Sequence, residues 1–250
     1  MLDVLIITGA SKGIGASIAA KCSTICKRMI VIASSPKIHQ VNFTSCDTTS
    51  LQLDLSDYDR VQHEVYKLVD KIPNINSIGI VCCASQLGSH GGVLDNHLSD
   101  LDKVYRCNLL GNLAVVKACA DYIPHVKSRI VFFGGGGAAY GYPEFSGYAL
   151  SKVATVRAAE NLSMELSKYD SSVIALAPGA VATDILDQVV AHGGMVKTRT
   201  DISEPTNFVY KFLIDELPSK ELNGRFLHVR DDISSIDLSN TDILKLRRIQ

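Results

Sequence analysis

The amino-acid sequence predicts an α/β fold, with a doubly wound, mainly parallel sheet covered by helices on both faces in three layers. Three observations predict it. Short apolar runs alternate with longer segments whose apolar residues recur at helical spacing. Hydrophobic residues make up 46% of the chain, which suits strands that are buried on both faces. No stretch resembles a linker, so we expect residues 1–250 to form a single domain.

Strands are expected where an apolar run stops at glycine, proline or a polar cluster, as the run 29–33 stops at Ser34-Ser35-Pro36. Helices are expected where apolar residues recur three and four positions apart, and prolines at 73 and 124 end two of them. In chain order, the expected elements are a strand at 2–8, a helix at 13–27, a strand at 29–33, a short strand at 51–53, a helix at 58–72, a strand at 77–83, a helix at 98–122, a strand at 129–133, a helix at 147–168, a strand at 173–177, a helix at 204–215 and a strand at 225–229.

Three other segments lack a clear period. Residues 134–147 are a glycine-rich loop, and residues 180–202 are expected as a mobile loop or short helices. Within the latter, residues 184–202 are a candidate substrate lid. The polar segment 231–250 is either a solvated tail or a strap across a partner subunit.

Charge and hydropathy limit the classes of partner. The net charge is −1 and no basic block is present, so we expect no nucleic-acid partner. No apolar run approaches the ~18 residues that span a bilayer, and the N-terminal residues 1–7 lack a basic leader and cleavage site. We therefore expect a soluble, cytoplasmic protein without a membrane partner.

The seven cysteines form an odd set without CxxC spacing, and most lie in apolar segments. This pattern indicates reduced core thiols. The seven histidines are scattered, and none pairs at metal-ligand spacing. We expect no metal site.

A tyrosine and a lysine stand four residues apart in Tyr148-Ala149-Leu150-Ser151-Lys152. On a helix, positions i and i+4 share a face, which places the ammonium beside the phenol. A phenol normally titrates near pH ~10. A fixed ammonium favours the phenolate, so we expect the pKa of Tyr148 to fall and its oxygen to exchange a proton near neutrality.

A glycine-rich turn lies between the first strand and the first helix, with the sequence Thr8-Gly9-Ala10-Ser11-Lys12-Gly13-Ile14-Gly15. Such a turn faces the crevice where open α/β sheets bind ligands. Glycines let the backbone approach a pyrophosphate, and the helix N-terminus offers free N–H groups. The turn predicts phosphate binding, although its spacing differs from G-x-G-x-x-G.

Together, the two motifs resemble those of the short-chain dehydrogenase/reductases, single-domain Rossmann enzymes that use NAD(H) or NADP(H). The octet resembles the family loop T-G-x-x-x-G-x-G, and the resemblance runs from Leu5 to about Val229. It implies that Tyr148 and Lys152 are catalytic and that Lys152 also contacts the nicotinamide ribose.

The choice of cofactor follows from the end of the second strand. NAD sites usually place a carboxylate there to hold the ribose hydroxyls. This chain has Ser34 and Ser35 instead, and Lys12 is available for a 2′-phosphate. We expect NADP(H) to be preferred, with NAD(H) possible. Lys12 as a solvated loop lysine is the alternative.

The resemblance implies further cofactor contacts. Asp54 and Leu55 match the family segment beside the adenine, with a helix N-cap as the alternative for Asp54. Ala84 lies in Cys82-Cys83-Ala84-Ser85, where the family usually has Asn-Asn-Ala-Gly. Residues 178–183 resemble the P-G-x-V-x-T turn at the nicotinamide end, and its matching residues are Pro178, Gly179, Val181 and Thr183.

Two positions concern the chemistry itself. Asn108 matches the family asparagine that is associated with a water relay to the lysine. The family serine, thirteen residues before the tyrosine, is replaced by Gly135. A backbone N–H of the glycine run can take over its task, as can a nearby hydroxyl. The candidate hydroxyls belong to Ser85, Tyr140 and Ser146.

The missing serine is equally consistent with a larger or anionic substrate in the vacated space, or with a protein that binds nucleotide without catalysis. The retained Tyr148, Lys152 and Asn108 favour an oxidoreductase that acts on a carbonyl or alcohol. A non-catalytic nucleotide-binding protein and a cofactor-assisted lyase or epimerase remain alternatives.

Substrate and assembly are read from resemblance alone. The glycine run, residues 222–232 and residues 246–249 resemble reductases of bacterial surface-sugar pathways, which implies a sugar or nucleotide-sugar, while a fatty or aromatic ketone stays open. In the lid, residues 192–194 are a candidate hinge, and Lys197 and Arg199 are candidate anion contacts. Family members pair through helices matching 98–122 and 147–168, which implies a homodimer or homotetramer.

Overall fold

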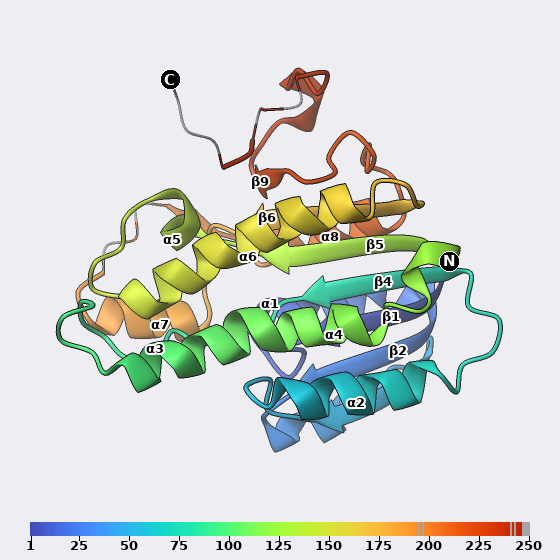
Figure 1. Cartoon of the computed structure of the whole chain (residues 1–250), viewed down its shortest axis with the longest axis horizontal. Coiled ribbons are helices and arrows are strands. Elements are labelled where there is room, and N and C mark those ends of the chain that lie inside the picture. The colour runs from blue at the N-terminus through green and yellow to red at the C-terminus, as the bar shows by residue number, and fades with distance from the viewer. Residues whose placement is uncertain (195, 197, 241, 243, 247–250) are drawn as a thin grey trace.

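The computed structural model describes residues 1–194, 196, 198–240, 242 and 244–246. Its centre is a parallel sheet in the order β3-β2-β1-β4-β5-β6-β9 (Figure 1). The strands are β1 (Leu2–Thr8), β2 (Cys26–Ala33), β3 (Asp47–Gln52), β4 (Ser77–Cys82), β5 (Lys127–Phe133), β6 (Ser171–Ala177) and β9 (Phe226–His228). The predicted doubly wound α/β fold is confirmed.

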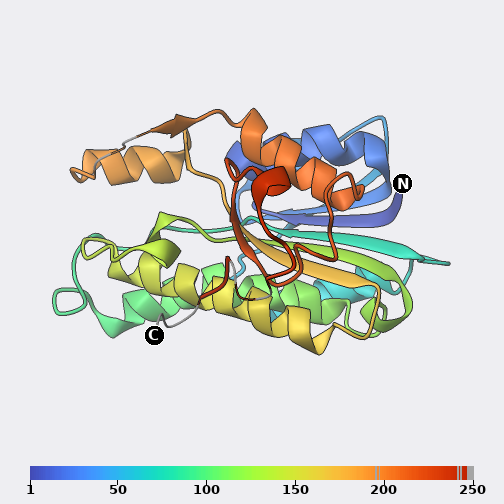
Figure 2. The same cartoon turned by 90° about the horizontal axis from the view of Figure 1, so that it is seen from above.

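Helices cover both faces of this sheet. One face carries α1 (Gly13–Cys22) and α8 (Ser203–Leu213), and the other carries α2 (Tyr58–Val69), α4 (Asn112–Ala118) and α6 (Ser146–Glu165). Figure 2 shows the three layers edge-on, with the blue and orange helices on one side and the cyan, green and yellow helices on the other.

Alternation along the strands divides the core in two. In β1, Val4 and Ile6 join the cluster under α2, α4 and α6, whereas Leu5 and Ile7 join the cluster under α1 and α8. Successive side chains of a strand point to opposite faces, so a strand buried on both faces reads as a continuous apolar run.

The smaller elements complete the chain. Two β-strands, β7 (Ala180–Val181) and β8 (Arg199–Thr200), pair in parallel on either side of α7 (Asp184–Ala191). Helix α3 (Leu98–Tyr105) precedes α4, and α5 (Gly136–Ala139) follows β5. Short 3-10 turns span Ser23–Ile25, Pro36–Gln40, Ile123–His125 and Ile233–Ser235.

The expected helix 98–122 is wrong in its middle. A π-helical segment, Arg106–Gly111, separates α3 from α4. A side chain on Gly111 would overlap the backbone and side chain of Leu55, so the helix passes close to the segment after β3 there. The wider turn surrounds Asn108, whose side chain is buried and bonded to another segment.

Several boundaries also differ from expectation. The third strand is Asp47–Gln52 rather than 51–53, because it is the outermost strand, half-exposed, and therefore polar in sequence. The second strand begins at Cys26 rather than 29, since Cys26 and Arg28 pair with Leu2 and Val4. The first helix accordingly ends at Cys22 instead of 27.

The described part of the C-terminal tail lies on its own chain. The Leu246 N–H donates to Glu160 Oε1 at 2.7 Å, and Arg157 Nη2 donates to the Leu246 carbonyl at 2.7 Å. Both partners belong to α6, so the tail packs against that helix.

No helix within the described ranges is long and apolar enough to cross a bilayer. In the same ranges, no three His, Cys, Asp or Glu side chains are grouped as a metal site. All seven cysteines carry free thiols.

A buried arginine anchors the amino end of β5. Arg129 is 3% exposed, and its Nε donates to Asp215 Oδ1 at 2.7 Å. Lys127 and Ser219 also bond Asp215. Partial burial alone would raise the pKa of Asp215, but these hydrogen bonds and the Arg129 charge outweigh it and lower the pKa to about 2.

We expect Asp215→Asn to lower the free energy of unfolding by about 2 kcal/mol at pH 7. Asparagine tolerates the left-handed backbone of this residue (φ 58°), so the loss reports the charge. Because the folded pKa lies below the unfolded one, the stabilisation is complete above pH ~4 and disappears as the pH falls towards ~2. Urea titrations at several pH values measure it.

The control is Asp100→Asn, which breaks the exposed pair of Asp100 with Lys103. An exposed pair contributes little, so we expect a change below about 0.5 kcal/mol. Equal losses of unfolding free energy in the two variants would contradict the stabilising role assigned to the Asp215 carboxylate.

Candidate active site

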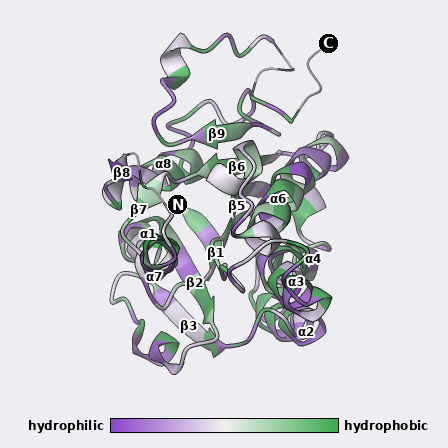
Figure 3. Cartoon of the chain, turned by 90° about the vertical axis from the view of Figure 1, so that its left-hand side faces the viewer, coloured by the Kyte–Doolittle hydropathy of each residue, from purple (hydrophilic) through white to green (hydrophobic). Residues whose placement is uncertain are grey.

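The predicted site residues gather at the carboxyl edge of the sheet, onto which Figure 3 looks. The strand order reverses between β1 and β4, which are neighbours in the sheet although the chain runs from β1 to β2. Ligands of open α/β sheets bind outside the carboxyl ends at such a reversal. The loops after β1, β4, β5 and β6 therefore frame one crevice.

The loop after β1 is shaped by close backbone approach. Gly9 has φ 70°, and a Cβ there would lie 2.9 Å from the backbone of Ala84. Gly13, with φ 57°, starts α1. Lys12 provides no side-chain cap to this helix, and its first turn contains no acidic residue. The free N–H groups and the positive end of the dipole suit a dinucleotide pyrophosphate.

Two buried asparagines hold the loop after β4. Asn112 Nδ2 donates to the Ala84 carbonyl at 3.0 Å, and Thr8 Oγ1 donates to Asn112 Oδ1 at 2.7 Å. Asn108 brackets Gln86, accepting its N–H at 2.8 Å and donating to its carbonyl at 2.9 Å. These bonds fix the segment 84–86 beside the glycine loop.

The same network reaches the tyrosine. Asn108 Nδ2 donates to Ser151 Oγ at 2.9 Å, and Ser151 Oγ donates to the Tyr148 carbonyl at 2.7 Å. Both hydrogens of the Asn108 amide are therefore used within the chain. Its side chain positions two segments, and the water relay implied by the family stays a prediction.

Helix α6 presents Tyr148 and Lys152 on one face. Lys152 is 3% exposed, its Nζ lies 5.4 Å from the centre of the Tyr148 ring, and it donates to the Phe133 carbonyl at 2.9 Å. The ammonium is thus directed at the end of β5 while lying over the phenol ring.

The expected fall in the pKa of Tyr148 is wrong for these residues. Burial raises the pKa of Tyr148, and Tyr142 and Cys83 add to the rise. Burial also lowers the pKa of Lys152 to about 8, against smaller opposite effects of Cys83 and Cys107. Desolvation, which four residues of sequence do not reveal, outweighs the attraction between ammonium and phenolate.

The glycine that replaces the family serine has a special backbone. Gly135 adopts φ 144° and ψ 179°, a region that is essentially restricted to glycine. A Cβ built there would meet only Tyr148 Oη, 3.6 Å away. The backbone of the loop at this position therefore requires glycine and excludes the family serine. The position faces the tyrosine.

We expect Gly135→Ser to lower the free energy of unfolding by about 2 kcal/mol through backbone strain and not to raise activity. Gly136→Ala is the control, because it lies in α5 and a Cβ there meets nothing within 4 Å. That change should be neutral or stabilising. Thermal unfolding and turnover measure both, and a stable, more active Gly135→Ser would contradict this account.

At the expected adenosine end of the cofactor site, several predicted side chains are bonded or buried within the chain. Ser34 is exposed, and Ser35 Oγ accepts from the Lys37 N–H as the cap of a 3-10 turn. Asp54 accepts from the Ser56 N–H and hydroxyl. The Leu55 side chain lies in the core, so only its backbone is available to a ligand.

Lys12 and the turn after β6 lie together. Lys12 forms an exposed ion pair with Asp184, the first residue of α7. Thr183 caps α7 through the Leu186 N–H, and its methyl group lies 3.3 Å from a Cβ built on Gly13. Thr183 thus lies beside the glycine loop, and the contact of Pro178, Gly179, Val181 and Thr183 with the nicotinamide end stays a prediction.

The candidate lid begins with the short helix α7, in agreement with the expectation of short helices in residues 180–202. After it, the His192 ring stacks on His90 at 4.6 Å, and both approach Phe145. Gly193 has φ 82°, Arg199 lies in β8, and Lys197 lies outside the described residues.

Sequence reasoning missed several residues of the site. They are the positioning groups Asn112 and Ser151 and the aromatic residues His90, Tyr142 and Phe145. A second asparagine four residues after Asn108, in an otherwise apolar segment, was a usable signal for Asn112. The aromatic contacts join three separate loops and have no local signature.

Comparison with known proteins agrees with this geometry. The family model described as short chain dehydrogenase matches residues 3–193. Versicolorin reductase of Emericella nidulans is 26% identical over 189 residues, covering 73% of this chain and 70% of that protein. Farnesol dehydrogenase of Aedes aegypti is 25% identical over 249 residues, covering 89% and 97%.

Solved structures show the same fold. A short-chain dehydrogenase/reductase of Saccharomyces cerevisiae matches with a TM-score of 0.80 and 20% identity, covering 93% of this chain and 98% of that one. ElxO with NADP bound covers 92% and 97%, and an NAD+-bound xylitol dehydrogenase covers 90% and 96%; each has a TM-score of 0.76 and 20% identity.

Proposed function

This chain belongs to the short-chain dehydrogenase family, and we propose that it is an NAD(P)H-dependent oxidoreductase that interconverts a carbonyl and an alcohol. One observation carries the proposal. A network of hydrogen bonds ties the Tyr148 backbone to the segment beside the glycine loop, so the proton donor and the cofactor cradle are linked. Such positioning is what proton transfer to a substrate held beside the cofactor requires.

The proposed roles follow from position. The reduced nicotinamide supplies the hydride when bound. Tyr148 Oη gives its proton to the carbonyl oxygen of the substrate. Lys152 holds positive charge beside the phenol, which stabilises negative charge left on that oxygen after the transfer. Asn108 holds α6 against the loop after β4 through its bonds to Ser151 and Gln86.

The proposed cofactor is NADP(H) in preference to NAD(H). The end of β2 carries Ser34 and Ser35 and no carboxylate that would repel a 2′-phosphate. Lys12 lies in the glycine loop, and its exposed pair with Asp184 is weak enough for a phosphate to displace.

We expect Lys12→Ala to raise the Kd for NADPH by about 10-fold and to change the Kd for NADH by less than ~2-fold. Titration followed by the fluorescence of the reduced nicotinamide measures both. Lys21→Ala, at the far end of α1, is the matched control and should change neither. An equal loss for both cofactors would assign Lys12 to the pyrophosphate and remove the support for NADP(H).

The surroundings of Tyr148 favour an apolar carbonyl over a sugar. Leu87, Phe145 and Val189 form a buried cluster against which Tyr142, Tyr148 and Ile185 pack. Aromatic and aliphatic walls match a flat or aliphatic ketone better than a polyhydroxylated ring. Two relatives, the versicolorin reductase and a trihydroxynaphthalene reductase of Pestalotiopsis fici, support the same direction.

The decisive experiment offers NADPH and NADH with a panel of bicyclic aryl ketones, aliphatic ketones and sugars, monitored at the absorbance of the reduced nicotinamide. Oxidation of the cofactor with one of these carbonyls is the expected result. Nucleotide binding without turnover would support a binding protein, and conversion of a substrate without net oxidation would support a lyase or epimerase.

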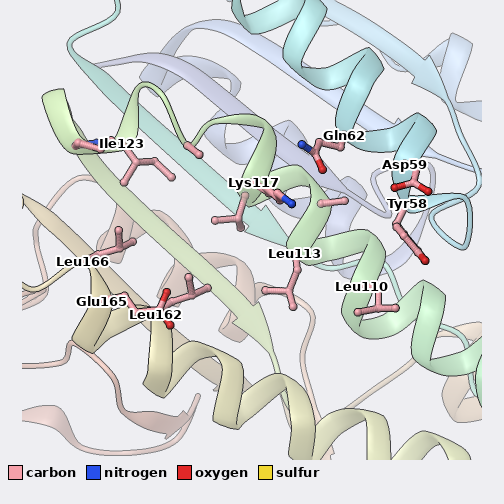
Figure 4. A pocket seen from close by; sticks show the side chains of 14 residues that line it. Tyr58, Asp59, Gln62, Leu110, Leu113, Lys117, Ile123, Leu162, Glu165 and Leu166 are labelled. Carbon is pink, nitrogen blue, oxygen red and sulfur yellow. The ribbon is translucent and has the colours of Figure 1, made fainter.

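We also propose a homodimer formed through α4 and α6. A groove of about 490 Å³ lies between α2, α4 and the end of α6, with Leu110, Leu113 and Leu162 among the side chains that line it (Figure 4). On α6, Leu150 and Val153 are 45% and 40% exposed. Sedimentation should give twice the chain mass of 27.0 kDa, and a monomer would contradict the proposal.

The free thiols fit a cytoplasmic location.

A further inference from the structure

One buried hydroxyl at the crevice lacks a partner within the described part of the chain. Ser85 Oγ is buried and forms no hydrogen bond with any described residue. A buried polar group without a partner destabilises the folded state, because it has lost its bonds to water. Native proteins tolerate such a loss where the group has a use, so this oxygen calls for a role.

The pairing of β4 with β5 places Ser85 next to Gly135, the position at which the family has its serine. Strands β4 and β5 pair in parallel, with Ser77 opposite Lys127 and Cys82 opposite Phe132. The same register, continued three residues past the last pair, sets Ser85 level with Gly135. Neighbouring strands lie about 4.8 Å apart, so this register brings the Ser85 backbone beside Gly135, the position of the family serine, where a built Cβ lies 3.6 Å from Tyr148 Oη.

The backbone around Ser85 is held on both sides. Ala84 is bonded through its N–H and carbonyl to Thr8 and Asn112, and Gln86 is bonded through the same groups to Asn108. Because Asn108 is also linked to the Tyr148 carbonyl through Ser151, one network positions Ser85 and Tyr148 relative to each other. Leu87, two residues on, shares a cluster with Tyr148.

The two other hydroxyls near the loop are less suitable. Tyr140 is 79% exposed. The Ser146 hydroxyl already donates to the Pro143 carbonyl at 2.9 Å. Of the three, Ser85 alone combines burial with a hydrogen that no described residue accepts.

We propose that Ser85 Oγ donates a hydrogen bond to the carbonyl oxygen of the substrate and takes over the task of the absent serine. The inference rests on the proposed function. Hydride adds to the carbonyl carbon, the C=O π electrons move to oxygen, and Tyr148 Oη gives that oxygen its proton. Ser85 keeps its own proton and stabilises the developing charge. Rotation about χ1 turns the hydroxyl from its buried position towards the ligand.

The test is Ser85→Ala, with opposite effects expected on rate and stability. Loss of the donor should lower kcat for reduction of a bicyclic aryl ketone by about 10²-fold. Loss of an unpartnered buried hydroxyl should raise Tm by about 2–4 °C. A purely structural serine would move Tm and leave kcat unchanged, which would overturn the proposal.

Ser172→Ala is the matched control. Ser172 Oγ is also buried without a hydrogen bond to the described residues, and it lies at the amino end of β6, away from the crevice. We expect the same rise in Tm with unchanged kcat.

The Kd for NADPH separates the remaining alternative. It should be the same in Ser85→Ala and the wild type, and a rise of about 10-fold or more would assign Ser85 to the nicotinamide ribose and contradict the proposal. If the wild type turns over no carbonyl, the proposed function fails. Calorimetric binding of the aryl ketone to the NADP+ complex then decides on Ser85, since a donor to the carbonyl predicts weaker binding in Ser85→Ala and equal binding refutes it.

Discussion

Tyr148→Phe is expected to lower kcat for carbonyl reduction by about 10³-fold while the Kd for NADPH changes by less than ~2-fold. The substitution removes one oxygen that approaches the loop after β5, and the ring keeps its place against Leu87 and Phe145. Because burial raises the pKa of Tyr148, the phenol is protonated at neutral pH and is ready to act as an acid.

Steady-state turnover and fluorescence titration with NADPH give the two quantities separately. Tyr142→Phe is the matched control, since Tyr142 packs in the same cluster on the neighbouring loop. It should retain turnover within ~3-fold. Wild-type turnover in Tyr148→Phe would remove Tyr148 from the chemistry, and a parallel loss of NADPH affinity would make it a cofactor ligand.

Lys152→Met is expected to lower kcat by about 10²-fold and to change how stability depends on pH. Burial lowers the pKa of Lys152 to about 8, below its unfolded value of 10.5. Between these values the unfolded chain binds more protons, so the stability of the wild type rises with pH in this window. Across this window, the free energy of unfolding of the wild type should rise by about 3 kcal/mol relative to that of Lys152→Met.

Below pH ~8 the buried ammonium destabilises the wild type, partly offset by its hydrogen bond to the Phe133 carbonyl. Urea titrations of both proteins between pH 7 and 10.5 test the sign. Lys103→Met, on the exposed side of α3, is the control and should follow the wild type. A difference between wild type and Lys152→Met that stays constant with pH would mean that Lys152 titrates normally.

The sequence was sufficient for the order of strands and helices because burial on both faces leaves continuous apolar runs. Residues 2–8 were recognised in this way, whereas the turn from Thr8 to Gly15 was recognised from its glycines and its place after that strand. Edge strand β3 was placed too late, since a half-exposed strand carries no such run. The π-helical segment at Arg106–Gly111 was missed because the apolar spacing continues through it, and its close approach to Leu55 joins residues remote in sequence.

At the site, too, features with a local sequence pattern were predicted, and features that depend on tertiary contacts were not. Tyr148 and Lys152 were identified by their helical spacing and Asn108 by the family resemblance, and the structure links Asn108 to the Tyr148 helix through Ser151. The pKa of Tyr148 was predicted in the wrong direction, because the helical spacing reports the neighbouring charge and not the desolvation. The absence of a serine at Gly135 was visible in the sequence, whereas the glycine-only backbone there and the unpartnered Ser85 hydroxyl are tertiary features of the described chain.

Transfer of deuterium from NADPH that carries two deuterium atoms at the reactive nicotinamide carbon tests the central claim most directly. After reaction with a carbonyl substrate, mass spectrometry of the product should find one deuterium on the carbinol carbon, formed by the wild type and about 10³-fold more slowly by Tyr148→Phe. Product formed without deuterium, or label retained entirely in the cofactor, would show that the protein does not transfer hydride.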